Sequence, residues 1–122
     1  GNYYFVLRHR NAIETWSATS QSISSGMFYD FTDVPNRSLG DNMKNLEPGA
    51  YGLYSGDISN NANQAVQDGI INESDLGQME ISLDQMLSGY YINDLTGDNM
   101  IESSDYSLIE NNMQLNITVH RP

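Results

Sequence analysis

The stretch that most constrains this chain runs from Asp94 to Asp105, where oxygen-bearing side chains recur at regular intervals. Asp94, Thr96 and Asp98 occupy its first, third and fifth positions, and Asp105 occupies the twelfth. In a tightly curled loop, this spacing directs alternate side chains towards one centre. The sixth position needs a left-handed backbone, and Asn99 is a residue type that accepts this conformation. The stretch therefore predicts a closed loop lined by oxygen atoms.

Oxygen ligands at this spacing are typical of an EF-hand-like calcium-binding loop, because Ca²⁺ is a hard cation that prefers carboxylate and carbonyl oxygens. Met100 stands at the seventh position, where the main-chain carbonyl binds, and Glu102 at the ninth would bind directly or through water. Asp105 takes the place of the usual bidentate Glu. The predicted ligands of this loop, which we call loop 2 (residues 94–105), are Asp94, Thr96, Asp98, Met100, Glu102 and Asp105.

A second copy of the pattern lies thirty residues upstream, with Asp68 in register with Asp98. The copy reads Asp68-Gly-Ile-Ile-Asn-Glu-Ser-Asp75 and also ends on a carboxylate at its twelfth position. Strict spacing would need good oxygen ligands at residues 64 and 66, but the chain has Gln64 and Val66 there. The first ligands of this copy must therefore lie further upstream.

Asp57 and Ser59 are the natural candidates for these displaced first ligands, and residues 61–67 would then be looped out before Asp68. An alternative register keeps Asp57, Ser59 and Asn61 together and loops out the residues that follow. We favour the first register because Asp68 and Gly69 match the repeat. The predicted ligands of this loop, which we call loop 1 (residues 57–75), are Asp57, Ser59, Asp68, Ile70 through its carbonyl, and Asp75.

Both stretches have a simpler interpretation as turns, because Asp and Asn side chains readily bond to their own backbone. Two copies at a near-constant period, each followed by a helical pattern, favour the calcium interpretation. We therefore predict two bound calcium ions.

The net charge of −11 is unevenly distributed along the chain. Residues 57–111 contain eleven Asp and Glu and no Lys or Arg, whereas the remainder contains five acidic and five basic residues. Such a segment repels itself unless cations neutralise it, and no basic face is available for nucleic-acid phosphates. No apolar run approaches the ~20 residues of a membrane-spanning helix, so membrane insertion is not expected. A strand-like run follows Gly1 directly, which favours a processed piece of a longer protein.

The hydrophobic pattern predicts an α+β fold, in which a small antiparallel β-sheet packs with a pair of EF-hand-like calcium loop–helix units. Alternation predicts strands over 3–8, 13–17, 26–31 and 50–54, and helical spacing predicts helices over 74–87 and 104–113. A last strand over 116–120 is expected to return to the N-terminal sheet. The chain would then comprise a β-rich part (1–56), the paired loops (57–113) and the closing strand (114–122), folded as one unit.

Other chemistry is weakly indicated, and we predict that the chain is not an enzyme. It has no cysteine and shows no nucleophile–base arrangement, zinc spacing or phosphate loop. If the termini pair, a basic cluster could bind an anion or neutralise nearby carboxylates; its members are Arg8, His9, Arg10, His120 and Arg121. The aromatic residues could line a sugar-binding face, or they could form the core; the core candidates are Tyr3, Phe5, Trp16, Phe28, Phe31 and Tyr51.

Residues 57–113, with the sequences Asp68-Gly-Ile-Ile-Asn-Glu-Ser-Asp and Asp94-Leu-Thr-Gly-Asp-Asn-Met-Ile-Glu-Ser-Ser-Asp, resemble a type I dockerin. That resemblance implies two calcium-binding loop–helix units and docking onto a cohesin domain. The segments Tyr4-Phe-Val-Leu-Arg-His-Arg-Asn, Tyr29-Asp-Phe-Thr, Tyr54-Ser-Gly-Asp and His120-Arg-Pro are similar to a dockerin-like module of large secreted or surface proteins in bacteria that use type IX secretion. The chain departs from the pattern in the loop 1 insertion, Thr96 and Asn99.

The resemblance implies a non-catalytic calcium-binding accessory module of a larger secreted or cell-surface bacterial protein, with a role in structure, assembly or adhesion. Two alternatives remain open. One is a dockerin-like protein–protein interaction module that binds a cohesin-like partner. The other is a carbohydrate-binding module that uses exposed aromatic residues to bind a surface glycan.

Overall fold

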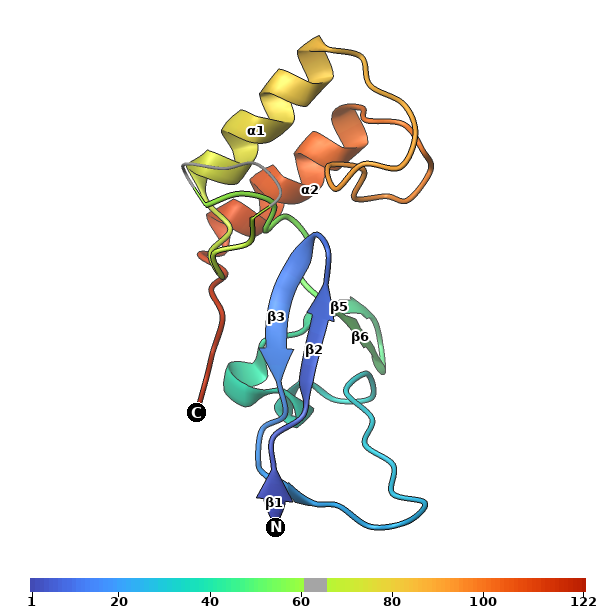
Figure 1. The fold of residues 1–122 in the computed structure, drawn as a ribbon, viewed down its shortest axis with the longest axis vertical. Coiled ribbons are helices and arrows are strands. Elements are labelled where there is room, and N and C mark those ends of the chain that lie inside the picture. The colour runs from blue at the N-terminus through green and yellow to red at the C-terminus, as the bar shows by residue number, and fades with distance from the viewer. Residues whose placement is uncertain (61–65) are drawn as a thin grey trace.

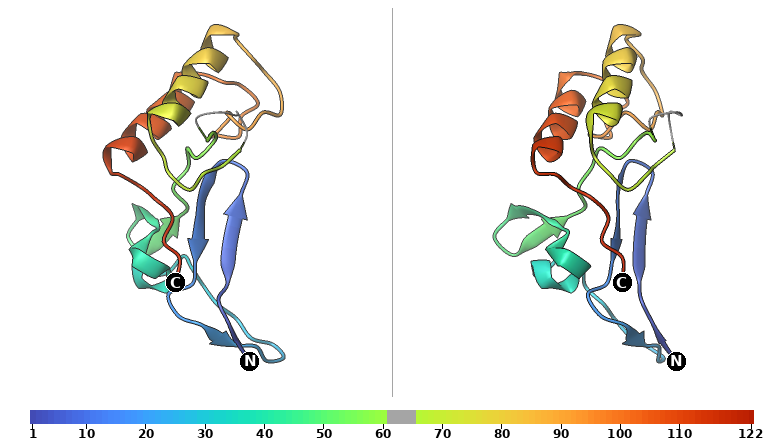
Figure 2. Two further views of the ribbon diagram at one scale, coloured as in Figure 1. Left: turned by 60° about the vertical axis from the view of Figure 1, so that its left-hand side comes forward. Right: turned by 90° about the vertical axis from the view of Figure 1, so that its left-hand side faces the viewer.

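The computed structural model describes residues 1–60 and 66–122, which form a small α+β fold with short antiparallel sheets and two helices (Figure 1). The two helices lie side by side at one end of the molecule, and the N-terminus lies at the other end (Figure 1). A β-hairpin extends between these ends, and its tip points towards the helices (Figures 1 and 2). This hairpin is the element that brings the N-terminal part to the predicted loops.

The β-structure consists of three separate two-stranded pairs, so the prediction of one sheet is wrong. The pairs are β1 (Asn2–Tyr3) with β4 (Gln21–Ser22), β2 (Val6–His9) with β3 (Ala12–Trp16), and β5 (Lys44–Glu47) with β6 (Ala50–Gly52). Two short 3₁₀ helices, Pro35–Arg37 and Leu39–Asp41, stand between the second and third pairs. Turn-forming residues surround each pair, which keeps the strands too short to extend into a common sheet.

Two predicted strands are not found in the described part of the chain. Residues 26–31 contain no strand, and Phe28 is 84% exposed, so it is not a core residue, whereas Phe31 is buried. Residues 116–120 make a single isolated bridge, between Thr118 and Ile70. The C-terminal segment therefore pairs with loop 1 and not with the N-terminal sheet. Burial of Ile117 in the helix core favours this position, because it removes an apolar side chain from water.

Both predicted helices are confirmed, as α1 (Glu73–Asp84) and α2 (Ser103–Gln114). They pack against each other, and each begins immediately after a predicted loop (Figure 1). Each is followed by a left-handed residue, Met86 with φ 52° and Asn116 with φ 56°. The thirty-residue repeat therefore extends past the helices into their C-terminal turns. Within the described residues, no helix has both the length and the apolar character needed to span a membrane.

One apolar cluster joins the loops, the helices and the hairpin. Its fully or nearly fully buried members are Ile13, Ile58, Ile71, Met79, Ile101, Ile109 and Ile117. Ile71 and Ile101 occupy equivalent positions in the two loops, and Met79 and Ile109 occupy equivalent positions in the two helices. Ile13, from β3, is the member contributed by the N-terminal part. Each such side chain contributes about 1.5–3 kcal/mol by its burial, which holds the hairpin tip against the loops.

Candidate metal-binding loops

Loop 2 is curled around the carboxylate of Asp94, which is only 2% exposed. Its Oδ1 accepts hydrogen bonds from the N–H groups of Gly97 at 2.8 Å and Asp98 at 3.2 Å. Its Oδ2 accepts a hydrogen bond from the N–H of Asn99 at 2.8 Å. One side chain thus binds three successive backbone donors and produces the tight curl that the oxygen spacing predicted.

Asp105 closes the same loop from the first turn of α2, and it is completely buried. Its Oδ1 accepts hydrogen bonds from the N–H groups of Leu95 at 2.8 Å and Thr96 at 2.9 Å. Its Oδ2 accepts one from the N–H of Glu102 at 2.9 Å. The first and twelfth residues of the loop therefore hold its two ends together.

Loop 1 repeats the contacts of Asp94 through Asp57, which is 1% exposed. Asp57 Oδ1 accepts a hydrogen bond from the N–H of Asp68 at 3.1 Å, and its Oδ2 accepts one from Gly69 at 3.0 Å. Asp68 and Gly69 are equivalent to Asp98 and Asn99. This contact agrees with the register in which Asp57 precedes Asp68 across the insertion. Asn61, which the alternative register needs, lies outside the described residues.

Asp75 repeats the contacts of Asp105 and is also completely buried. Its Oδ1 accepts hydrogen bonds from the N–H groups of Ile58 at 2.8 Å and Ser59 at 2.9 Å, and its Oδ2 accepts one from Asn72 at 2.9 Å. The Ser59 hydroxyl contacts the Ser74 hydroxyl and the Asp75 carboxylate. The two loops thus share most of their internal hydrogen bonds in spite of the insertion in loop 1; the bond from Gly97 to Asp94 has no counterpart among the described bonds of Asp57.

The predicted left-handed backbone at the sixth position is confirmed in both loops. Gly69 has φ +81° and Asn99 has φ +67°. A Cβ on Gly69 would lie 2.6 Å from Val119 Cγ1, so this position also needs the absence of a side chain. Asn99 is exposed, so its side chain extends into solvent while the backbone keeps a positive φ.

Each loop pairs with the segment that follows one of the helices. Met100 in loop 2 bridges Ser88, which follows α1, and Ile70 in loop 1 bridges Thr118, which follows α2. The flanking bonds correspond as well: Gly89 N–H donates to the Asn99 carbonyl at 2.7 Å, and Val119 N–H donates to the Gly69 carbonyl at 2.7 Å. Sequence reasoning missed this pairing, although Ser88 and Thr118 are separated by the same thirty residues as the loops.

The buried carboxylates accept hydrogen bonds and form no ion pair within residues 1–60 and 66–122, although Asp57 lines a cavity with Arg8 and Arg121. Among the described residues, the ion pairs involve Glu14 and Asp33, and none involves a loop carboxylate. Burial raises the pKa of Asp57 to about 7, although the hydrogen bonds from the backbone N–H groups of Asp68 and Gly69 lower it in part. Burial also raises the pKa of Asp75. Burial alone would raise the pKa of Asp94 too, but its three backbone donors hold that pKa below the ordinary value.

Ser59 is also buried, whereas the remaining predicted ligands lie nearer the surface. Asp98 and Thr96 are exposed, the Met100 side chain is 53% exposed, and Glu102 is half-buried and accepts a hydrogen bond from the Ser104 hydroxyl at 3.1 Å. In the part of the chain that the structure describes, no group of three or more Asp, Glu, His or Cys side chains is arranged to hold a metal ion. The buried carboxylates accept hydrogen bonds from backbone N–H groups, and the exposed carboxylate of Asp98 does not join them in one cluster.

The donor set is nevertheless of the chemical type that suits a hard cation. The loops supply carboxylate, hydroxyl and main-chain carbonyl oxygens, which are the groups that Ca²⁺ prefers. Buried carboxylates without a positive partner are unfavourable, and a divalent cation would neutralise them. The calcium assignment of the predicted ligands stays a prediction.

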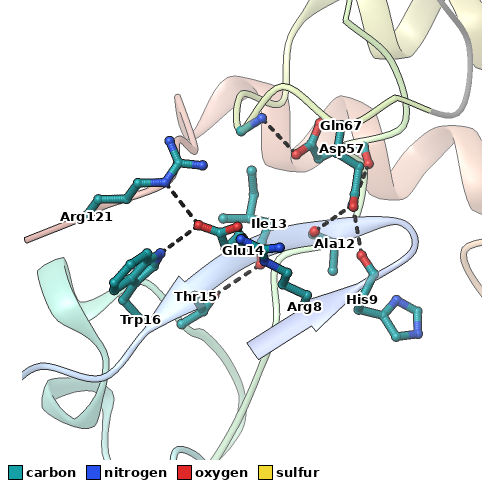
Figure 3. A network of polar contacts seen from close by, with 11 residues as sticks. Arg8, His9, Ala12, Ile13, Glu14, Thr15, Trp16, Asp57, Gln67 and Arg121 are labelled. Carbon is teal, nitrogen blue, oxygen red and sulfur yellow. Dashed lines mark hydrogen bonds and ion pairs between the residues drawn. The ribbon is translucent and has the colours of Figure 1, made fainter. Parts of the chain in front are cut away.

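The basic residues near the termini do not form one cluster. Arg8 and Arg121 both pair with Glu14, at 2.8 Å and 3.0 Å, and the Trp16 indole N–H donates to the same carboxylate at 2.6 Å (Figure 3). Arg10 lies instead over the ring of Tyr90, with its guanidinium carbon 4.0 Å from the ring centroid. Arg8 and Arg121 thus neutralise a carboxylate, which is one of the two roles that the sequence left open.

Comparison with protein-family models, with curated protein sequences and with solved structures finds no match to this chain. The residues and contacts described above are therefore the basis for assigning a function.

Proposed function

We propose that this chain is a non-catalytic, calcium-stabilised accessory module of a larger secreted or cell-surface bacterial protein. Its role would be structural, in assembly or spacing, or adhesive. The observation that carries the proposal is the duplicated pattern of hydrogen bonds in which Asp57 and Asp75 repeat the contacts of Asp94 and Asp105. Two loops built alike around buried carboxylates favour a shared task over two unrelated turns.

The proposed ligands of loop 2 are the side chains of Asp94, Thr96, Asp98, Glu102 and Asp105, with the Met100 carbonyl. Those of loop 1 are the side chains of Asp57, Ser59, Asp68 and Asp75, with the Ile70 carbonyl. When bound, Ca²⁺ would supply positive charge to carboxylates that the folded chain keeps out of water. The residues themselves shape each loop, bind backbone donors and connect it to the following helix.

The composition of the ligand set supports an extracellular setting. Thr96 is a neutral ligand where Asn or Asp is usual, and Asp75 and Asp105 are shorter than the usual Glu. The shorter Asp side chains make bidentate binding less complete, which lowers the affinity for Ca²⁺ towards the ~10⁻⁴–10⁻³ M range of extracellular modules. Such a module would be loaded outside the cell and not in a calcium-poor cytoplasm.

The test is thermal unfolding of the metal-free protein, titrated with calcium and separately with magnesium. A ligand that binds only the folded state stabilises it by ~2.7 kcal/mol at a hundredfold excess over its dissociation constant. We expect a large rise in the unfolding temperature with calcium and a smaller rise with magnesium, which demands a tighter octahedral site. A folded, metal-free protein whose unfolding temperature does not respond to calcium would refute the proposal.

A protein-docking role is the second candidate, because several large apolar side chains around the helices are exposed. Met86 is 88% exposed, Leu115 58% and Ile81 51%. A stable one-to-one complex between the calcium-loaded chain and a cohesin-like domain would favour this role. Binding on a glycan array would instead favour the carbohydrate-binding alternative, for which Tyr90, at 82% exposed, is the most accessible tyrosine among the exposed large side chains.

A further inference from the structure

The tip of the β2–β3 hairpin contacts the beginning of both loops through one residue, Asn11, which is only 3% exposed. Its main-chain carbonyl accepts a hydrogen bond at 2.7 Å from the N–H of Gly56, the residue before Asp57. Its side-chain Nδ2 donates to the carbonyl of Asp94 at 3.2 Å. Asp57 and Asp94 are the first residues of loops 1 and 2, so the same residue lies at the start of each.

We infer that Asn11 is a positioning residue for both loops, and that it couples their conformations. The inference rests on the proposed function, because it concerns the first proposed ligand of each loop. Asn11 binds no ion itself. It sets the backbone position of Asp94 through its side-chain amide and that of Asp57 through its carbonyl contact with Gly56. Asn11 is therefore a buried polar connection between the two loops, beside the shared apolar core.

The side-chain amide of Asn11 has a function that other residue types cannot replace. Besides the Asp94 carbonyl, Nδ2 donates to the carbonyl of Ile92 at 3.0 Å, so both of its hydrogens have acceptors. Aspartate has the same shape but would place carboxylate oxygen against these two carbonyl oxygens. Alanine would leave the carbonyls without this donor in a site that water does not reach easily.

Further contacts hold the hairpin tip rigid on the loop 1 side. Gln67, just before Asp68, donates from Nε2 to the carbonyls of His9 and Ala12, both at 2.9 Å, and to the carbonyl of Asp57 at 3.0 Å (Figure 3). One amide thus connects the tip to the first residue of loop 1. A rigid tip is required for coupling, since a flexible connection would absorb any displacement.

On the loop 2 side, Arg10 donates from Nη1 to the carbonyl of Tyr91 at 3.0 Å. Ile13, which follows the tip, is fully buried in the shared core, and its N–H donates to the Tyr54 carbonyl at 2.8 Å. Core packing and polar contacts therefore hold the same few residues of the hairpin between the two loops. The N-terminal β-part is consequently part of the proposed sites and not a separate attachment.

The first experiment measures the stepwise calcium affinities of the full chain by competition with a chromophoric chelator. Asn11→Asp should weaken binding at loop 2 by about tenfold or more, because it removes two hydrogen bonds of about 0.5–1.5 kcal/mol each on that side. It should weaken binding at loop 1 by about fivefold through the coupling. Asn45→Asp, an exposed change of the same charge on β5, is the matched control and should alter either step less than about twofold. A loss confined to one step, or an equal loss in the control, would overturn the inference.

The second experiment tests the coupling itself with Asp98→Ala, which removes a ligand proposed for loop 2 alone. In the otherwise unchanged chain, this substitution should weaken the remaining loop 1 site by about fivefold or more, within the usual range of coupling between sites. In the Asn11→Asp background, its effect on loop 1 should be clearly smaller than in the unchanged chain. If Asp98→Ala leaves the calcium affinity of loop 1 unchanged in the otherwise unchanged chain, the proposed coupling is wrong.

A metal-free measurement separates failure of this inference from failure of the calcium proposal. Hydrogen exchange in chelator follows the amides of Gly97 to Asn99, which Asp94 binds, and those of Asp68 and Gly69, which Asp57 binds. Asn11→Asp should increase exchange in both groups, whether or not calcium binds. Exchange that increases in neither group, or in one group only, overturns the positioning role. If Asn11→Asp does not fold, Asn11→Ala, which adds no buried charge, replaces it in all three experiments.

Discussion

Asp98→Ala should reduce the stability of this protein much more when calcium is present than when it is absent. Asp98 is exposed, and its carboxylate accepts one hydrogen bond, from the Met100 N–H at 3.0 Å. Loss of a single exposed hydrogen bond costs at most about 1 kcal/mol in the metal-free protein. The contribution of Asp98 as a ligand is lost in addition, but only under conditions in which an ion would bind.

The size of the calcium-dependent loss follows from mass action. At a hundredfold excess of calcium over the dissociation constant, one site stabilises the fold by ~2.7 kcal/mol. If Asp98→Ala abolishes binding at loop 2, that whole contribution disappears. For a chain of this length, 1 kcal/mol corresponds to about 4 °C in the unfolding temperature. We therefore expect a loss of about 4 °C or less in chelator and of about 10–15 °C in calcium, where both contributions are lost.

The assay is thermal unfolding of the variant and the unchanged protein, each in calcium and in chelator. Asp84→Ala is the matched control, because Asp84 is an exposed carboxylate at the end of α1 and lies in the same acidic segment. It reports the general effect of removing one negative charge. Equal losses for Asp98→Ala in calcium and in chelator would refute the assignment of loop 2 as an ion site.

Asp105→Ala should cost about 3 kcal/mol even in chelator, since it leaves the buried N–H donors of Leu95, Thr96 and Glu102 without their acceptor; a loss that appears only in calcium would contradict this structural role. Gly69→Ala should destabilise loop 1 by more than 1 kcal/mol in urea unfolding, because φ is +81° and the new Cβ would meet Val119. Met86→Gly should raise stability by up to about 1 kcal/mol, because Met86 is exposed and has φ 52°; unchanged stability would show that this backbone carries little strain. Glu14→Gln tests pH dependence in chelator: burial raises the pKa of Glu14, but the Trp16 hydrogen bond and Arg121 and Arg8 together lower it below 4.5. A lowered folded-state pKa gives stability that is present above 4.5 and lost as the pH falls through the folded value, so Gln should reduce the loss of stability below pH 4.5.

Local features of the sequence predicted the loops and helices well. The oxygen spacing from Asp94 to Asp105 indicated a closed loop, and its contacts span eleven residues or fewer. Asn99 was identified as the left-handed residue because few residue types accept positive φ, and its φ is +67°. The helices follow from apolar spacing and from carboxylates at their first turns. In each case the interacting groups are close in sequence, so the pattern of residue types carries the information.

The register of loop 1 was only partly predictable from the sequence, because it depends both on local spacing and on a contact across the insertion. Asp57 binds the N–H of Asp68 across eleven positions, and residues 61–65, within that insertion, are outside the described part of the chain. The repeat suggested this pairing through Asp68 and Gly69, but spacing alone left a second register open. Both registers begin at Asp57, and the contacts of Asp57 with Asp68 and Gly69, which match those of Asp94 with Asp98 and Asn99, favour the first.

Long-range pairing was decided only by the tertiary structure. The pattern at 116–120 is equally suited to a sheet strand, yet Ile117 is buried among the helices and its neighbours pair with loop 1. Alternation at 26–31 likewise could not show that Phe28 is left in solvent. Asn11 gave no signal at all, because an asparagine in a hairpin turn is ordinary, and its importance arises from segments over eighty positions away. By itself the sequence determined which short stretches curl or coil, since those preferences are local; the fold decided which of them meet, since that depends on how the whole chain buries its apolar side chains.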